Sequence, residues 1–177
     1  LAIHPLGQFA GNAKTANATI DVIEAKGTKQ WVGYSFTWFA TMLAHVGRAE
    51  EALDYLRMYE RSFTLRNGFH ANGEQTNEGL SSFKYRPFTL EGNFLAMEAV
   101  HEMLLQSDGG VLRLFPAVSA EWKDVSFTNL RAEGGFIVSA ERRGGKLQRC
   151  TVAATVDGVL RMIDPFSGRA TERMMKK

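Results

Sequence analysis

The polar stretch between residues 64 and 90, with the residue that follows it, holds the side chains best suited to chemistry. Long ordered loops of this length are usually functional. The side chains of this stretch that could take part in binding or catalysis are Asn67, His70, Asn72, Glu74, Asn77, Glu78, Tyr85, Arg86 and Glu91. A sugar site needs groups that hydrogen-bond hydroxyls, a carboxylate that acts on water or on a leaving oxygen, and an aromatic face. All three kinds of group occur here, so the stretch is a candidate carbohydrate site.

Glu91 is the candidate catalytic residue of this set, because it stands where helical periodicity resumes. The unpaired N–H groups of a helix start carry partial positive charge, which favours an ionised carboxylate and therefore a base or an anion rather than an acid. Gly92 follows directly and leaves room for a close approach. A carboxylate in the first helical turn is also a common stabilising feature, and this alternative stays open.

Five residues are candidate substrate-binding residues: His70, Asn72, Tyr85, Trp31 and His4. Three of them have a structural alternative. His70 could be a polar loop residue with satisfied hydrogen bonds, and His4 could bond only a local backbone group. Trp31 could face a sugar, although aromatic residues at helical spacing usually pack in a core. No second residue stands at metal-ligand spacing from His70, so we expect neither a metal nor another cofactor.

The composition of the 177-residue chain is that of a globular protein, with 45% hydrophobic and 23% charged residues. Its 21 basic and 19 acidic residues are spread along the sequence, so we expect no nucleic-acid partner. No apolar stretch reaches the roughly 18 to 20 residues of a membrane span. Cys150 is the single cysteine, which excludes an internal disulfide framework, and its apolar setting favours a buried thiol. The basic end at residues 174–177 indicates a frayed, solvated terminus.

Hydrophobic periodicity predicts four helices, at residues 16–26, 30–46, 48–63 and 91–106. The second helix is apolar nearly all round, which is typical of a buried helix, whereas the third is apolar on one side only. Gly27 and Gly47 end the first and second helices. A buried aromatic helix joined by a tight turn to an outer amphipathic helix is the unit from which helical hairpins and two-layered helical barrels are built.

After Gly110 the periodicity changes to short alternating or β-branched runs separated by turn residues, which predicts strands. The runs are VLRLF, VSFTNL, GFIVSAE, KLQRCTVAAT and VLRMI. Gly144-Gly145 and Glu133-Gly134-Gly135 are predicted hairpin turns. The predicted fold class is α+β, with a helical domain at residues 1–108 and a small antiparallel β-sheet or β-sandwich domain at residues 109–177.

Four segments of the sequence resemble the C-terminal part of glycoside hydrolase family 95, the α-L-fucosidase-like enzymes. The segment FTLEGNFLAMEAVHEMLLQSDGGVLRLFPAVSAEW is similar to a family segment in which a carboxylate precedes Gly-Asn-Phe, a helix ends in EMLLQS, and a strand runs to Leu/Phe-Pro-Ala. IHPLGQFAG, WVGYSFTWFATMLAHVGRAEEAL and LRAEGGFIVSAE are similar to three further family segments. The resemblance covers nearly the whole chain.

The resemblance implies a bacterial inverting glycoside hydrolase with an (α/α)6-type helical barrel, of which this chain carries the last helices and a closing β-domain. It places Glu91 where the family has an aspartate that activates the attacking water together with upstream asparagines. The general acid is then a glutamate in an upstream part of the same polypeptide, so we expect the chain alone to be inactive. Leu1 lies inside an apolar run without an initiator methionine, which also indicates a longer protein. Analogy indicates a periplasmic or secreted one.

Three positions bear on the substrate. Glu91 is one methylene longer than the family aspartate, and Tyr85 stands where the family often has a substrate-contacting histidine. The Arg-His pair that the family places just before the position of His4 is not part of this sequence. We expect an oligosaccharide or glycan substrate with an α-L-fucoside or a related α-L-galactoside. The alternative is a non-catalytic carbohydrate-binding or structural module, in which the polar loop binds a sugar or merely packs.

Overall fold

The computed structural model describes residues 2–7, 12–164 and 167–177. The chain divides into two compact units, Leu1–Glu102 and Met103–Lys177, and each is described by itself. In the described residues the first unit consists of helices and the second mainly of small antiparallel sheets, so the predicted α+β class is confirmed. No helix among these residues is both long and apolar enough to cross a membrane.

Helix α1 (Ala13–Ala25) begins at Asn12, whose side chain accepts a hydrogen bond from Thr15 N at 3.2 Å. The chain leaves the helix through Gly27, which has a φ of 72°. Arg48 ties this helix to the rest of the unit, because its guanidinium pairs with Asp21 at 2.6 Å and with Glu24 at 3.3 Å. Charged contacts therefore hold α1 in place, and so does the small buried face of the helix.

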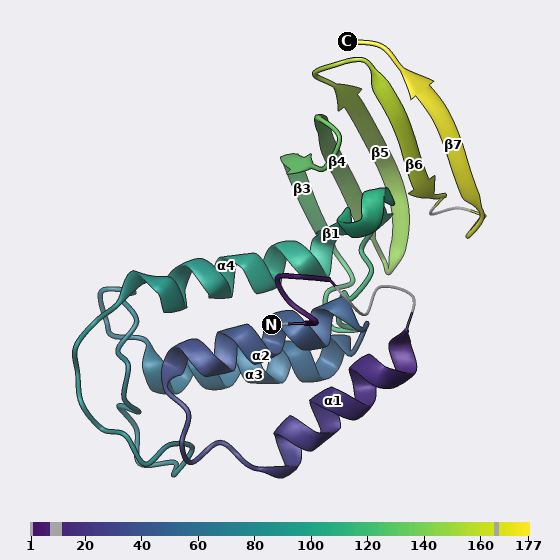
Figure 1. Cartoon of the computed structure of the whole chain (residues 1–177). Coiled ribbons are helices and arrows are strands. Elements are labelled where there is room, and N and C mark those ends of the chain that lie inside the picture. Colours follow the sequence, from purple (N-terminus) through teal and green to yellow (C-terminus); the bar gives the residue numbers. More distant parts are fainter. Residues whose placement is uncertain (1, 8–11, 165–166) are drawn as a thin grey trace. The chain divides into compact units, whose positions relative to one another are not determined.

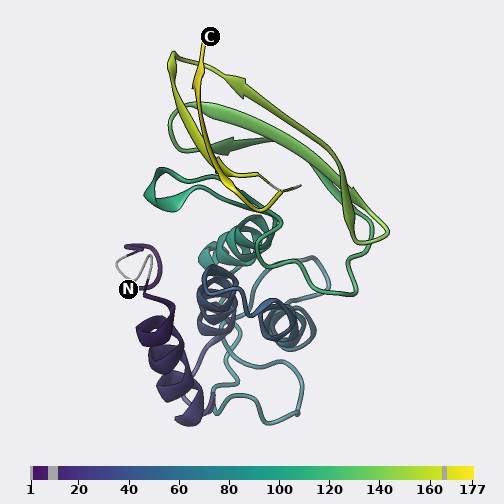
Figure 2. The same ribbon diagram turned by 90° about the vertical axis from the view of Figure 1, so that its right-hand side faces the viewer.

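Helices α2 (Gly33–His45) and α3 (Ala49–Phe63) form a hairpin and run side by side in both views (Figure 1, Figure 2). Gly47, with a φ of 78°, supplies the tight turn between them. The predicted buried character of α2 is confirmed, since Phe36, Phe39 and Leu43 are at most 1% exposed. These side chains form the core on which the preceding and following loops rest.

The second helix begins three residues later than the periodicity predicts, so Trp31 precedes the helix instead of lying in it. Val32 has extended backbone (ψ 170°), and Gly33 N donates to the carbonyl of Asn72 at 3.0 Å. The N–H of Gly33, which has no partner within the helix, is therefore hydrogen-bonded to the polar loop.

Helix α4 (Leu90–Leu104) follows the polar loop and buries Ala99 and Met103. Its Leu90, Phe94 and Met97 lie at helical spacing and are 41%, 58% and 54% exposed. An exposed apolar stripe of this kind marks a face that meets another element or a ligand.

The described residues of the second unit form three antiparallel sheets. They are built from β1 (Leu105–Gln106) with β2 (Arg113–Leu114), from β3 (Val125–Ala132), β4 (Phe136–Arg143) and β5 (Lys146–Ala154), and from β6 (Gly158–Ile163) with β7 (Ala170–Met175). A short 3-10 helix spans Asp108–Gly110. Turns at Gly134-Gly135 and Gly144-Gly145 join β3 to β4 and β4 to β5, as predicted. All five predicted runs contain strand residues.

The chain end differs from the sequence prediction. Met174 and Met175 belong to β7, which pairs with β6, so the expectation of a frayed terminus is wrong for them. Lys176 Nζ and Lys177 N also contact the carboxylate of Asp157, at 2.9 and 3.0 Å. Strand β7 is exposed along nearly its whole length, and a strand without a buried face shows no alternating apolar pattern. Cys150 in β5 is half-buried, and burial raises the pKa of its thiol.

Candidate functional site

The polar loop between α3 and α4 is a folded-back ribbon. Residues 71–74 and 83–88 run antiparallel, and Gly73 N donates to the Tyr85 carbonyl at 2.9 Å. A Cβ on Gly73 would fall closer than 3 Å to the backbone of Tyr85, so this position requires glycine. The ribbon returns the chain to the first turn of α4 in a fixed conformation.

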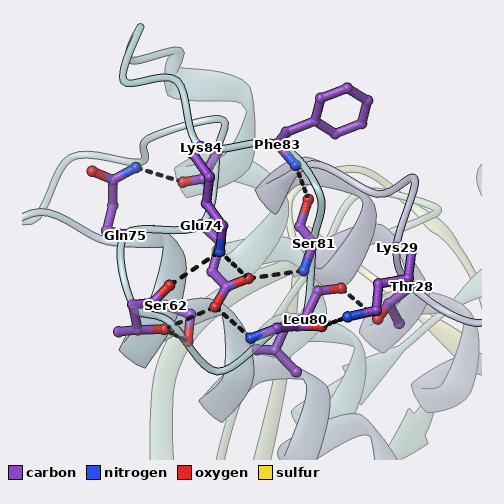
Figure 3. A network of polar contacts seen from close by, with 12 residues as sticks. Thr28, Lys29, Ser62, Glu74, Gln75, Leu80, Ser81, Phe83 and Lys84 are labelled. Carbon is purple, nitrogen blue, oxygen red and sulfur yellow. Dashed lines mark hydrogen bonds and ion pairs between the residues drawn. The ribbon is translucent and has the colours of Figure 1, made fainter.

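Glu74 lies buried at the far end of this ribbon, with 2% exposure. Its carboxylate accepts hydrogen bonds from Gly79 N and Ser81 N, each at 2.9 Å, and pairs with Lys84 Nζ at 2.8 Å (Figure 3). Burial by itself raises the pKa of this carboxyl, but the Lys84 ammonium and the two backbone N–H groups outweigh it and lower the pKa from 4.5 to about 2. Glu74 is therefore ionised at neutral pH and organises the loop.

His70 is fully buried where the ribbon meets α2, α3 and α4. Its ring lies between Gly33 of α2 and Gly92 of α4, and a Cβ on either glycine would fall closer than 3 Å to the imidazole. The space beside Gly92 that the sequence suggested for a ligand is thus occupied by this ring. Burial lowers the pKa of His70, while the hydrogen bond to the Thr89 carbonyl and the charge of Glu91 act in the opposite direction.

Glu91 is exposed in the first turn of α4, as its position in the sequence predicts. The residues around it are anchored to the loop. Asn93 Oδ1 accepts from His70 N at 2.9 Å, and Asn93 Nδ2 donates to the Gly68 carbonyl at 2.8 Å. A carboxylate that reaches solvent from an anchored backbone can act as a general base on a water molecule.

The structure joins His70 and Asn72, two of the predicted site residues, to the start of α4. Thr89 makes the connection, because its hydroxyl lies 3.1 Å from His70 Nδ1 and donates to Asn72 Oδ1 at 3.3 Å. Asn72 also accepts the Gly33 N–H through its carbonyl. These two residues therefore shape the site from within.

Tyr85 and Trp31 have different surroundings. Tyr85 is 45% exposed and packs edge-on against Phe83, with ring centroids 5.8 Å apart. Trp31 is half-buried, and its ring centroid lies 5.4 Å from that of Phe36 and 5.1 Å from that of Phe39. Trp31 thus packs into the aromatic core, as the structural alternative had it, and its contact with substrate stays a prediction.

His4 contacts other parts of the helical unit. Its Nε2 lies 3.8 Å from Glu98 Oε1 in the second half of α4, and its ring centroid lies 5.4 Å from that of His45 at the end of α2. The His4 side chain is the main cause of the lowered pKa of Glu98. The roles of His4 and Tyr85 in substrate binding, and the expectation of no metal or cofactor, stay predictions.

Phe69 and Phe88 form an exposed aromatic pair that the sequence reasoning missed. Their ring centroids are 5.2 Å apart with an interplanar angle of 29°, and they are 41% and 55% exposed. Phe88 precedes Glu91 by three residues, and exposed aromatic faces can pack against the apolar face of a sugar. The two phenylalanines are visible in the sequence, but their pairing depends on the ribbon that brings residues 69 and 88 together.

Comparison with known proteins gives two matches. Residues 106–174 match the model of "Glycoside hydrolase family 95, C-terminal domain". The chain is also 32% identical over 154 residues to Alpha-L-fucosidase 2 of Arabidopsis thaliana, a match that covers 81% of this chain and 18% of the relative. The chain therefore spans about a fifth of the length of that relative. The second unit is shorter than the 81% of the chain that the match covers, so the match also extends well into the helical unit.

Proposed function

The chain belongs to the C-terminal part of glycoside hydrolase family 95, and from this premise we propose that it forms part of an inverting glycosidase for α-L-fucosides or related α-L-galactosides. Membership of the family implies a glycan substrate. The observation that carries the proposal is Glu91, an exposed carboxylate on an anchored helix start, three residues after Phe88 of a stacked aromatic pair.

We assign Glu91 the role of general base. In an inverting reaction one carboxylate removes a proton from water as that water attacks the anomeric carbon, and a second carboxylic acid protonates the leaving oxygen. The partial positive charge of the α4 N-terminus favours the ionised form that a base requires. The two carboxyl groups stand roughly 6.5–9.5 Å apart in such enzymes, which leaves room for the water.

The general acid is proposed to come from an upstream part of the same polypeptide. The apolar stripe of Leu90, Phe94 and Met97 supports this arrangement, because it gives α4 an exposed face on which further helices can pack. The hairpin of α2 and α3 and the helix α4 would then be the last elements of a helical barrel. On this proposal the chain alone binds sugar weakly and does not turn it over.

The second candidate function is that of a carbohydrate-binding module without catalysis. The Phe69–Phe88 stack favours it, because this aromatic platform can bind sugar whether or not a base is nearby. The two functions differ in what Glu91 does. A binding module tolerates the loss of its charge, whereas a general base does not.

The experiment uses the protein that includes the complete barrel and compares two carboxylate-to-amide changes. Glu91→Gln keeps the shape but removes the basic oxygen, so kcat should fall by about 10²–10⁴-fold with little change in stability. Glu50→Gln makes the same change in the first turn of α3 and should leave kcat unchanged. Glu91→Asp should retain measurable hydrolysis. Full activity in Glu91→Gln would leave helix stabilisation as the function of this residue.

A further inference from the structure

His70 has a hydrogen-bonding pattern that fixes its tautomer. The Thr89 carbonyl, which can only accept, lies 2.9 Å from Nδ1, so Nδ1 carries the proton. The Thr89 hydroxyl lies 3.1 Å from the same nitrogen and donates onward to Asn72. Nε2 is buried without a hydrogen-bond partner in the described residues. The ring is therefore neutral and donates toward the chain that enters α4.

Two glycines and an aromatic ring lie against the imidazole of His70. Gly33 flanks it at Nε2, and Gly92 flanks it at Nδ1, because these are the atoms that a Cβ would strike. The ring of Tyr59 in α3 lies alongside, with centroids 5.5 Å apart. Three helices and the ribbon thus meet at one imidazole.

We propose that His70 is a positioning residue for Glu91: its neutral imidazole holds the Thr89 carbonyl and the first turn of α4, and thereby sets the direction of the Glu91 carboxylate. This inference rests on the proposed role of Glu91 as the base. The backbone bond from His70 N to Asn93 Oδ1 holds the same turn from its other side, so the residues on both sides of Glu91 are attached to one loop residue.

The same geometry makes the positioning sensitive to acid. Protonation would place a second N–H on Nε2, where it faces Gly33 and finds no acceptor in the described residues. Among the described residues, the Tyr59 ring of α3 lies beside the imidazole and the charge of Glu91 of α4 acts on it; burial outweighs this charge and lowers the pKa of His70. The attachment of His70 to Thr89 should therefore hold above pH 6.5 and weaken as the pH falls through the lowered pKa of His70.

Two amide substitutions separate positioning from packing, because packing alone favours the larger Gln. His70→Asn places an amide N–H near the position of Nδ1 and can still donate to Thr89. His70→Gln carries its amide N–H farther out, near the position of Nε2, and cannot. His101, in the last turn of α4, takes the same two substitutions as a control.

The expected result in the protein with the complete barrel is a kcat about 10²-fold lower in His70→Gln, with most activity kept in His70→Asn and little change in KM for either. The acid limb of the pH profile that belongs to His70 should disappear in His70→Asn. In the chain itself, the backbone N–H of Asn72 donates to Pro87 O at 3.1 Å. Hydrogen exchange of this N–H should be faster in His70→Gln than in His70→Asn. The His101 variants should show none of these effects.

Two results would overturn the inference in distinguishable ways. Equal kcat values in His70→Asn and His70→Gln, with Glu91→Gln inactive, would overturn the positioning role and leave Glu91 as the base. Full activity in Glu91→Gln would overturn the proposed function itself, and with it the residue that His70 is said to position.

Discussion

Glu74 allows the strongest prediction about stability, because its buried carboxylate accepts two backbone hydrogen bonds of the loop and pairs with Lys84. Its pKa falls from 4.5 to about 2. Each pKa unit corresponds to about 1.4 kcal/mol, so the ionised carboxylate stabilises the folded state by roughly 3 kcal/mol at neutral pH. Glu74→Gln turns an amide N–H toward the N–H of Gly79 or Ser81, where an acceptor is needed. We expect it to lose about that much.

The assays are urea unfolding and amide exchange of the chain at pH 7. Glu74→Gln should lower the urea midpoint and speed exchange at Gly79 and Ser81 by about a hundredfold, since 1.4 kcal/mol is a factor of ten. The control is Glu78→Gln, which removes a carboxylate of the same loop that pairs with Arg61 at 2.6 Å on the surface. Exposed ion pairs contribute little, so this variant should unfold nearly as the wild type does.

The pH dependence gives an independent check. Because the folded pKa lies below the unfolded one, the contribution of Glu74 is complete above pH 4.5 and is lost as the pH falls toward about 2. The difference between wild type and Glu74→Gln should therefore shrink over that interval. An unchanged midpoint at pH 7, or a difference that persists at pH 2, would show that the ionised Glu74 carboxylate does not stabilise the loop.

Two further predictions concern the site. Gly92→Ala should destabilise the chain by about 1–3 kcal/mol, because its Cβ would overlap the His70 ring. In a double-mutant cycle, most of that loss should disappear when His70→Ala is also present. Additive losses would contradict the overlap. Phe88→Ala should raise KM about tenfold with a smaller effect on kcat, because it removes half of the aromatic platform. Val156→Ala, an equally simple truncation of a side chain 54% exposed in the second unit, should leave KM unchanged, and an equal KM in all three proteins would exclude the platform.

The helices and most strands could be predicted from the sequence because each has a local signal. The apolar run of α2 and the one-sided pattern of α3 state which face is buried, and Gly27, Gly47 and Gly144-Gly145 mark where elements end. Strand β7 lacked such a signal because it buries almost nothing. Local pattern therefore predicts an element when that element has a buried face.

The site could be predicted only in part. Composition identified the loop and the helix start placed Glu91, but the burial of His70 and Glu74 depends on partners far apart in the sequence. Gly33 and Gly92 are 59 residues apart, yet both make room for one imidazole. Nothing in the spacing of Glu74 and Lys84 distinguishes a buried pair from two solvated charges. Such contacts become visible only when the ribbon is folded.

The proposed role of Glu91 is to activate the attacking water in an inverting hydrolysis, and the anomer formed as the first product is the sharpest test of that role. The measurement follows an α-L-fucoside by ¹H NMR in the protein with the complete barrel, before mutarotation mixes the anomers. We expect β-L-fucose as the first product in the wild type and in Glu91→Asp, and no more than a trace of product in Glu91→Gln. α-L-Fucose as the first product, or undiminished turnover in Glu91→Gln, would rule out this role of Glu91.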